Sequence, residues 1–222
     1  MGSLSQKTEH FISRSGQLEM AIAVSEAING AYPLVVEAST GVGKTYAYLV
    51  PALLSGERVL VSTATKALQD QLFGRDLPRL IKVLGIAVKA ALLKGRASYL
   101  CLHRLDLARH EPQLAEGVSL RALAKVEEWS TATTTGDLAE LAGLDERSPL
   151  VPFITSTREN CLGAQCPRYQ ACHVNLARRE AMAADIVVIN HHLFLRILLF
   201  ASLVSRNCCR QCASRFLTRL TS

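Results

Sequence analysis

The sequence lacks the features that mark several classes of protein. It has no low-complexity stretch and no internal repeat, and 49% of its 222 residues are hydrophobic, which favours a folded core over disorder. The segment after Met1 is polar and therefore lacks the apolar centre of a signal peptide. The longest apolar stretch, 181–204, is interrupted by Asp185, Arg196 and the polar run 190–192, a poor pattern for a membrane span. We expect a cytosolic protein with one large domain or two small ones.

Acidic residues are missing from one end of the chain, and this determines how the net charge is interpreted. The sequence carries 25 Lys and Arg against 19 Asp and Glu, a formal net charge of +6. Residues 196–222 contain five arginines and no acid, which leaves 20 basic against 19 acidic residues in 1–195. The charge therefore does not predict a nucleic-acid-binding face on the main part of the chain.

A disulfide framework is not expected either, although the chain has seven cysteines, because a cytosolic compartment is reducing. The main part of the chain contains Cys101, Cys161, Cys166 and Cys172. The other three, at 208, 209 and 212, crowd into the acid-free tail. Short cysteine tracts are weak predictors of sites, so we treat the two groups separately and do not assign a metal to the tail.

Helix and strand patterns alternate over the first 93 residues. Helices are predicted over 13–30, from Lys44 onward and over 65–80, and strands over 34–36, 58–62 and 88–93. Gly30 is a suitable end for the first helix, and Pro51 should end or kink the second. Strands that alternate with helices predict an α/β fold with a parallel sheet and flanking helices.

The pattern changes over 94–182, which is helical, punctuated by cysteines and without clear strands. Strand character returns over 185–190. The simplest interpretation is an α/β domain with an inserted, mainly helical domain, after which the chain re-enters the sheet. Residues 196–222 show no period and change composition again.

A phosphate-binding loop is predicted between the strand at 34–36 and the helix from Lys44. Its residues are Ala38, Ser39, Thr40, Gly41, Val42, Gly43, Lys44 and Thr45. The glycines let backbone N–H groups approach phosphate oxygens, and the new helix presents its positive end to the same anion. Lys44 would reach the β- and γ-phosphates and Thr45 would ligate Mg²⁺, so these two are the candidate catalytic residues. The alternative is a Gly-Lys turn of no special purpose, which the strand–loop–helix order disfavours.

The four cysteines of the main part are predicted to bind metal. Cys161, Cys166 and Cys172 lie within twelve residues, and thiolates packed so closely repel one another unless a cation neutralises them. Four-cysteine sites hold zinc or an iron–sulfur cluster. Gaps of four and five residues fit the zinc pattern poorly, although spacing alone does not decide the metal. His103 and His173 adjoin cluster cysteines and rank below them as ligands.

Together these segments resemble the DinG/XPD family of superfamily 2 DNA helicases, most closely its bacterial YoaA-like branch. The resemblance runs from about Arg14 to Leu195 and rests on six segments: 14–17 (RSGQ), 37–45 (EASTGVGKT), 62–72, 94–101 (KGRASYLC), 160–172 and 188–195 (VINHHLFL). Ala38 replaces the first glycine of the general phosphate-loop pattern, as is usual in superfamily 2. Ser39 and Val42 depart from the family motif.

The resemblance implies an incomplete RecA-like P-loop motor domain with an inserted iron–sulfur domain. Its parts would be 1–93 and the return strand 183–195 for the motor, 94–182 for the insertion and 196–222 for a non-homologous, frameshifted tail. Gln17 would read adenine, the segment 62–72 would touch single-stranded DNA, and the four cysteines would ligate a [4Fe–4S] cluster. Activity would be ATP-dependent 5′→3′ unwinding of single-stranded or forked DNA in the bacterial cytoplasm, associated with the nucleoid.

The acidic element that should follow the 186–195 segment is missing. No Asp or Glu occurs after Asp185, whereas a motor of this type needs an Asp for Mg²⁺ and a Glu to position water. We therefore expect a chain truncated before the DEAH box and inactive as a motor. The alternatives are a non-catalytic fragment that binds ATP and single-stranded DNA, or a pseudogene product. An unrelated P-loop kinase would need an aspartate that ends an apolar strand, and Asp185 precedes one.

Two further features have ordinary interpretations. Trp129, the single tryptophan, is expected to pack rather than to stack on a base. His191 and His192 are adjacent in a segment predicted to be extended, so their side chains would point to opposite faces. We therefore expect structural roles for both rather than a metal pair.

Overall fold

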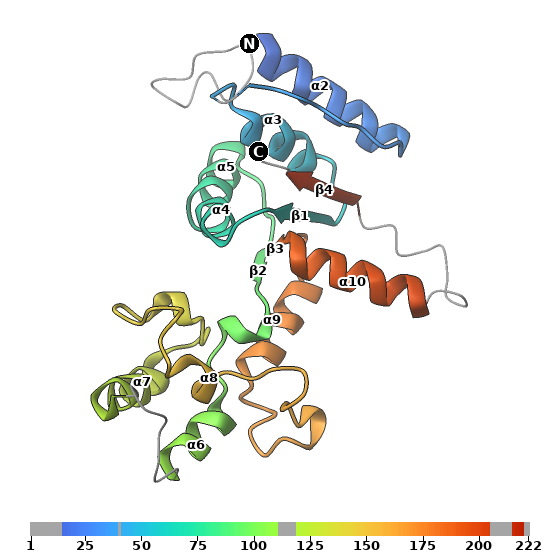
Figure 1. Ribbon diagram of the computed structural model, residues 1–222. Coiled ribbons are helices and arrows are strands. Elements are labelled where there is room, and N and C mark those ends of the chain that lie inside the picture. Colours follow the sequence, from blue (N-terminus) through green and yellow to red (C-terminus); the bar gives the residue numbers. More distant parts are fainter. Residues whose placement is uncertain (1–14, 40, 111–118, 205–214, 220–222) are drawn as a thin grey trace. The chain divides into compact units, whose positions relative to one another are not determined.

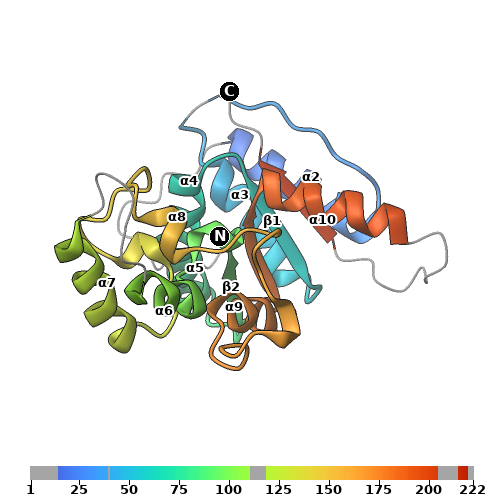
Figure 2. The same ribbon diagram turned by 60° about the horizontal axis from the view of Figure 1, so that its bottom comes forward.

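The computed structural model describes residues 15–39, 41–110, 119–204 and 215–219. The chain forms two compact units (Figures 1 and 2). The first, which we call the sheet unit, comprises Met1–Leu92 and Ala183–Ser222. The second, the cysteine unit, comprises Leu93–Met182. No helix in the described part of the chain is long and apolar enough to cross a membrane.

The sheet has four strands in the order β2-β3-β1-β4. They are β1 (Val59–Thr63), β2 (Ala90–Leu93), β3 (Ile186–Asn190) and β4 (Arg215–Arg219). Both β3 and β4 run parallel to β1. Residues 186–189 of β3 are all buried, as expected of a continuous apolar run inside a parallel sheet with both faces covered. The structure is therefore a small parallel α/β sheet, as the alternating pattern predicts.

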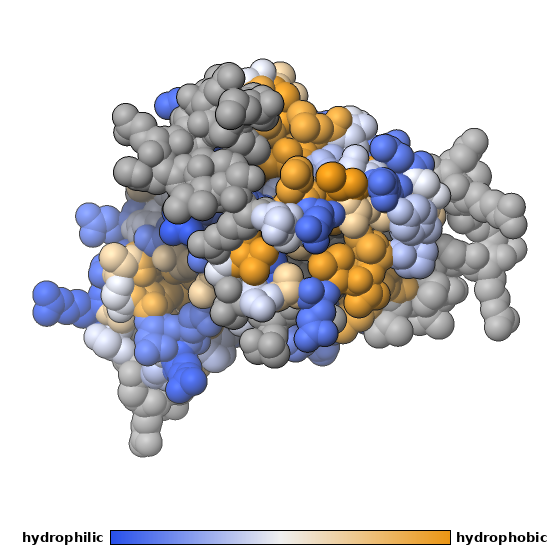
Figure 3. Space-filling model, turned by 90° about the horizontal axis from the view of Figure 1, so that it is seen from above, coloured by the Kyte–Doolittle hydropathy of each residue, from blue (hydrophilic) through white to orange (hydrophobic). Residues whose placement is uncertain are grey.

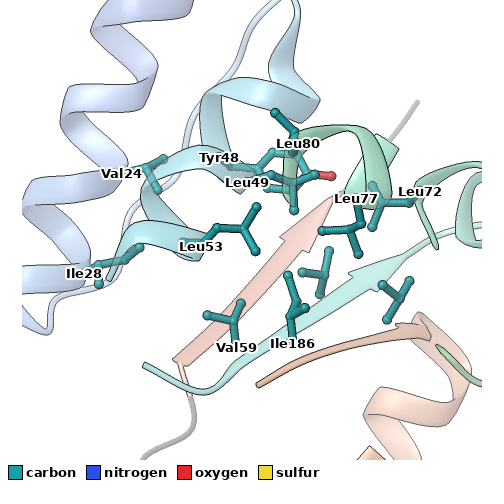
Figure 4. Packing of buried hydrophobic residues seen from close by; sticks show 13 residues of the cluster. Val24, Ile28, Tyr48, Leu49, Leu53, Val59, Leu72, Leu77, Leu80 and Ile186 are labelled. Carbon is teal, nitrogen blue, oxygen red and sulfur yellow. The ribbon is translucent and has the colours of Figure 1, made fainter. Parts of the chain in front are cut away.

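Helices of the sheet unit cover this sheet. They are α2 (Ser15–Gly30), α3 (Lys44–Leu54), α4 (Lys66–Gln71), a π-helical turn (Leu72–Asp76), α5 (Leu77–Leu84) and α10 (His191–Val204). Figure 4 shows the core, in which Val24 of α2, Leu49 of α3 and Leu77 of α5 gather over Val59 and Ile186 of the strands. This packing of helices on strands fixes α3, and with it the loop that precedes α3.

The predicted strand over 34–36 is wrong. The chain has no regular structure there, and the side chain of Val35 is 97% exposed. A strand persists only where a neighbour pairs its backbone N–H and C=O groups, and β3 and β4 occupy the two edges of β1. Exposed apolar residues remain along 32–36, and Figure 3 shows apolar surface on the face of the molecule seen from above.

Other elements differ from their predictions in detail. The helix α3 continues through Pro51 to Leu54, so the proline does not end it at once. The predicted helix over 65–80 contains a π-helical turn, in which the backbone N–H of Leu77 bonds to the carbonyl of Leu72. The tail, for which the sequence predicts no element, contributes the strand β4.

The segment after β3 is also helical rather than extended. Helix α10 begins at His191, and the side chain of Asn190 caps it by accepting a 2.8 Å hydrogen bond from the backbone N–H of Leu193. An Asn side chain at this position satisfies one of the free N–H groups of a first helical turn. The cap explains why the chain turns sharply into a helix directly after the strand.

The cysteine unit is mainly helical, as predicted for 94–182. Its elements are the 3₁₀ turns Arg96–Ser98, Leu138–Glu140 and Gly163–Gln165 and the helices α6 (Leu102–His110), α7 (Leu120–Ala132), α8 (Val151–Ile154) and α9 (His173–Met182). Its core includes Leu100, Leu105, Leu123 and Ile154. Trp129 packs against this core, which confirms the packing role predicted for it.

Candidate functional site

The predicted phosphate-binding loop lies at the start of α3. Gly41 and Gly43 have φ angles of 80° and 86°, in the left-handed region that glycine adopts without the steric cost of a Cβ. Gly43 is the N-cap of α3, and its carbonyl accepts hydrogen bonds from the backbone N–H groups of Tyr46 at 3.1 Å and Ala47 at 3.2 Å. The helix therefore starts directly from the loop, so that its N-terminal end faces the loop.

Lys44 reaches back over this loop. Its Nζ donates hydrogen bonds to the carbonyl of Ala38 and, at 3.2 Å, to the carbonyl of Ser39. An ammonium group is a compact cation with three donors, and here two of them are used by the loop itself. A phosphate oxygen that entered the loop would compete with neutral carbonyls for this charge, and the charged partner forms the stronger hydrogen bond.

Gln17 of α2 meets the same loop. Its Nε2 donates a 3.1 Å hydrogen bond to the carbonyl of Gly43. The structure thus brings Gln17, Ala38, Ser39, Gly43 and Lys44 together, although Gln17 contacts the loop backbone here. Thr45 and Val42 are half-buried beside them, and Gly41 is exposed. Two other predicted residues, Arg14 and Thr40, lie outside the described residues.

The conformation of Gly43 yields a prediction. Gly43→Ala should lower the free energy of unfolding by about 1–2 kcal/mol, because an L-residue is disfavoured in the left-handed region. The added Cβ would also lie 2.4 Å from Nε2 of Gln17, so the Gln17 contact must break and nucleotide binding should weaken. Urea denaturation and nucleotide titration measure the two effects.

Gly56→Ala is the matched control for this substitution. Gly56 has a φ of 70°, but a Cβ there would meet no atom within 4 Å. This variant carries the conformational cost alone and should bind nucleotide like the wild type. Equal nucleotide affinity in Gly43→Ala and Gly56→Ala would contradict the role assigned to the loop.

A second set of polar side chains lies at the carboxyl ends of β1 and β3. Ser62 and Thr63 are fully buried, and Oγ of Ser62 lies 2.6 Å from Nδ1 of His191. Both residues belong to the segment 62–72, which is predicted to touch single-stranded DNA. Their side chains face the protein interior, whereas Lys66 of the same segment is exposed. The contact supports a structural role for His191. Sequence reasoning missed this pair because its members are far apart along the chain.

The four predicted ligand cysteines all belong to the cysteine unit. Cys101 precedes α6 and is tied to the core, because its backbone N–H donates a 2.8 Å hydrogen bond to the carbonyl of Ile154. Cys161 is exposed, and Cys166 and Cys172 are half-buried. All four are free thiols, in agreement with the expectation that the main part of the chain has no disulfide framework.

The Cys101 thiol is affected by its burial and by two of the other cysteines. Burial is the main cause that raises the pKa of the Cys101 thiol, and the charges of Cys172 and Cys166 raise it further, against backbone N–H groups of Arg104 and His103 that lower it. Within the described ranges no three His, Cys, Asp or Glu side chains converge tightly enough to hold a metal ion. The donor set fits a thiolate-bound metal in its chemistry, and binding would require the cysteines to move closer together.

The neighbouring His173 packs against a glycine. Its side chain is buried, and a Cβ on Gly136 would lie 2.2 Å from its ring. Burial lowers the pKa of His173, and a backbone hydrogen bond at Thr134 partly opposes this effect. The close contact with Gly136 favours a structural role for His173.

Comparison with known proteins finds relatives whose similarity extends over both the sheet unit and the cysteine unit. A model of the DEAD/DEAH box helicase family matches residues 20–123. An ATP-dependent DNA helicase YoaA of Haemophilus influenzae is 52% identical over 193 residues, which are 87% of this chain and 30% of that protein. The Escherichia coli protein of the same name is 48% identical over 198 residues, with the same coverage of 87% and 30%. An ATP-dependent helicase DinG of Mycobacterium tuberculosis is 42% identical over 203 residues, 81% of this chain and 30% of the relative. The chain thus spans about a third of the length of these relatives.

Proposed function

We infer that this chain, which belongs to the DinG/YoaA type of helicase, forms the nucleotide-binding and iron–sulfur part of an ATP-dependent DNA helicase. The observation that carries the proposal is the loop before α3, where two left-handed glycines and the ammonium of Lys44 meet at the start of a helix. Such a loop is suited to a triphosphate, because backbone N–H groups and a cation converge on one anion.

Each residue of the loop has a role in this proposal. Gly41 and Gly43 let backbone N–H groups approach the phosphates, and Lys44 exchanges its bonds to Ala38 and Ser39 for bonds to phosphate oxygens. The hydroxyl of Thr45 is the proposed Mg²⁺ ligand, and bound Mg²⁺ would neutralise charge on the phosphates. Gln17, which already contacts Gly43, is the proposed partner of the adenine base.

We propose further that Cys101, Cys161, Cys166 and Cys172 hold a [4Fe–4S] cluster. The presence of four free thiols in one unit supports this, since thiolates that repel one another are stabilised by a cation. The spacing favours iron–sulfur over zinc. A bound cluster would connect the two ends of a loop of about 70 residues, whose closure otherwise costs chain entropy. In this proposal the fold of the chain keeps the thiols near one another.

Single-stranded or forked DNA is the proposed partner, with unwinding in the 5′→3′ direction in the bacterial cytoplasm. A second candidate is a non-catalytic binder of ATP and single-stranded DNA. It is favoured by one feature of the sequence, the absence of any Asp or Glu over 191–222. Without an acidic ligand for Mg²⁺ and an acid to position water, hydrolysis should fall by orders of magnitude.

Phosphate release by the 222-residue chain, measured with and without single-stranded DNA, separates the two candidates. We expect nucleotide to bind and DNA to cause no release above that of Lys44→Ala, because the loop can hold the triphosphate but no acid follows β3. Release that DNA stimulates, and that Lys44→Ala abolishes, would show that this chain is itself a motor. A salt-dependent shift of a labelled oligonucleotide would support the binding function.

A further inference from the structure

A chain of ion pairs crosses the cysteine unit. Nε of Arg168 lies 2.7 Å from Oδ2 of Asp106, whose Oδ1 lies 3.6 Å from Nη1 of Arg109. Nε of Arg109 in turn lies 2.7 Å from Oε1 of Glu127 on α7. The Arg168–Asp106 pair joins α6 to the loop 161–172, two segments that are far apart in the sequence.

Both segments carry proposed cluster ligands. Cys101 directly precedes α6, and its carbonyl accepts a 2.9 Å hydrogen bond from the backbone N–H of Leu105, so Asp106 lies one turn from this cysteine. Arg168 is two residues after Cys166. The ion pair therefore connects the helix that fixes one ligand with the loop that carries the other three.

The loop has little else to hold it in place. Residues 161–171 are exposed except for Cys166, so the loop contributes almost nothing to the core. Its backbone hydrogen bonds run mostly within itself, from Cys166 to Gly163, from Tyr169 to Cys166 and from Cys172 to Tyr169. A loop without buried side chains keeps its position only through such directed contacts.

We propose that Asp106 and Arg168 are positioning residues for the metal cluster, which hold the loop 161–172 beside Cys101. This proposal rests on the proposed function, because it requires the four cysteines to bind a cluster. The pair itself is solvent-exposed, and exposed pairs contribute little to the stability of a fold. Its effect on the cluster is therefore separable from its effect on folding.

The test uses the full chain, purified without oxygen, in its wild-type form and as Arg168→Gln, Asp106→Asn and the double variant. Iron and acid-labile sulfide per chain are measured first, and then the rate at which a chelator removes iron. We expect each single variant to lose iron several-fold faster than the wild type. The double variant should lose it no faster than either single variant, because both changes break one interaction.

Three controls isolate this role. Arg178→Gln removes the same charge from an exposed position on α9 and should release iron at the wild-type rate. Thermal unfolding of the iron-free proteins should give the same midpoint for all variants, which a structural role of the pair would not allow. Arg168→Lys keeps a cation that can pair with Asp106 and should recover part of the retention, and loss equal to that of Arg168→Gln would overturn the role of the ion pair.

The outcomes distinguish the two proposals. A wild-type chain without iron and sulfide would refute the cluster itself. A wild-type chain with its full cluster, released no faster from Arg168→Gln and Asp106→Asn, would refute the positioning role alone. Faster release from Arg178→Gln as well would show that net charge of the unit, and not this ion pair, governs retention.

Discussion

Replacing Lys94 with methionine should lower the free energy of unfolding of the cysteine unit by about 3–5 kcal/mol, the usual cost of leaving one buried charge without its partner. Nζ of Lys94 lies 2.6 Å from Oδ2 of Asp137, and the two side chains are 3% and 10% exposed. The backbone N–H of Lys94 also donates a 3.0 Å hydrogen bond to the hydroxyl of Tyr99. Trp129, the single tryptophan, packs in this unit, so its fluorescence during urea denaturation measures the effect.

A second substitution tests the cause of this loss. Asp137→Asn in the Lys94→Met background removes the orphaned charge and keeps an oxygen that can accept the 3.1 Å hydrogen bond from the backbone N–H of Ala139. The double variant should therefore recover a substantial part of the stability. Arg109→Gln breaks exposed pairs instead and should cost less than about 1 kcal/mol. A loss of less than about 1 kcal/mol in Lys94→Met as well would contradict the account of a buried pair.

Cys172→Ser should reduce the iron content of anaerobically purified protein to less than about a tenth of the wild-type value, because a hydroxyl group is a poor substitute for a thiolate ligand. Cys172 is half-buried, and it is one of the four proposed ligands. Iron and acid-labile sulfide analysis measures the loss.

A cysteine from the tail serves as the control. Cys212→Ser makes the same chemical change at a position outside the four proposed ligands and should leave the iron content unchanged. Equal losses in Cys172→Ser and Cys212→Ser would show that iron binds through cysteines in general and not through the proposed set.

The sequence predicts elements of the fold where local pattern and long-range pairing agree. The apolar run 186–189 is a strand because it is buried on both faces of the sheet. The apolar run 34–36 has similar local character but no strand partner, since β4 from the tail pairs with β1. Strand pairing is a property of the whole chain, and a local pattern does not determine which of two candidate segments obtains a given edge.

The candidate sites show the same division. The spacing of the glycines and Lys44 predicts the phosphate loop, because all of its groups lie within a few residues of one another. The contacts that position the sites, in contrast, join residues that are not close in the sequence. The pairs Lys94–Asp137, Asp106–Arg168 and Ser62–His191 each join residues far apart in the sequence, and no short-range signal predicts them.

Equilibrium titration of the 222-residue chain with ATP and Mg²⁺ tests the central claim most directly. We expect saturable binding in the wild type that Lys44→Ala weakens roughly 10- to 100-fold, the range for losing a hydrogen bond to a charged group, while Lys82→Ala on α5 binds normally. Wild-type affinity in Lys44→Ala, or no binding by a folded wild-type chain, would contradict the claim that this loop holds a nucleotide.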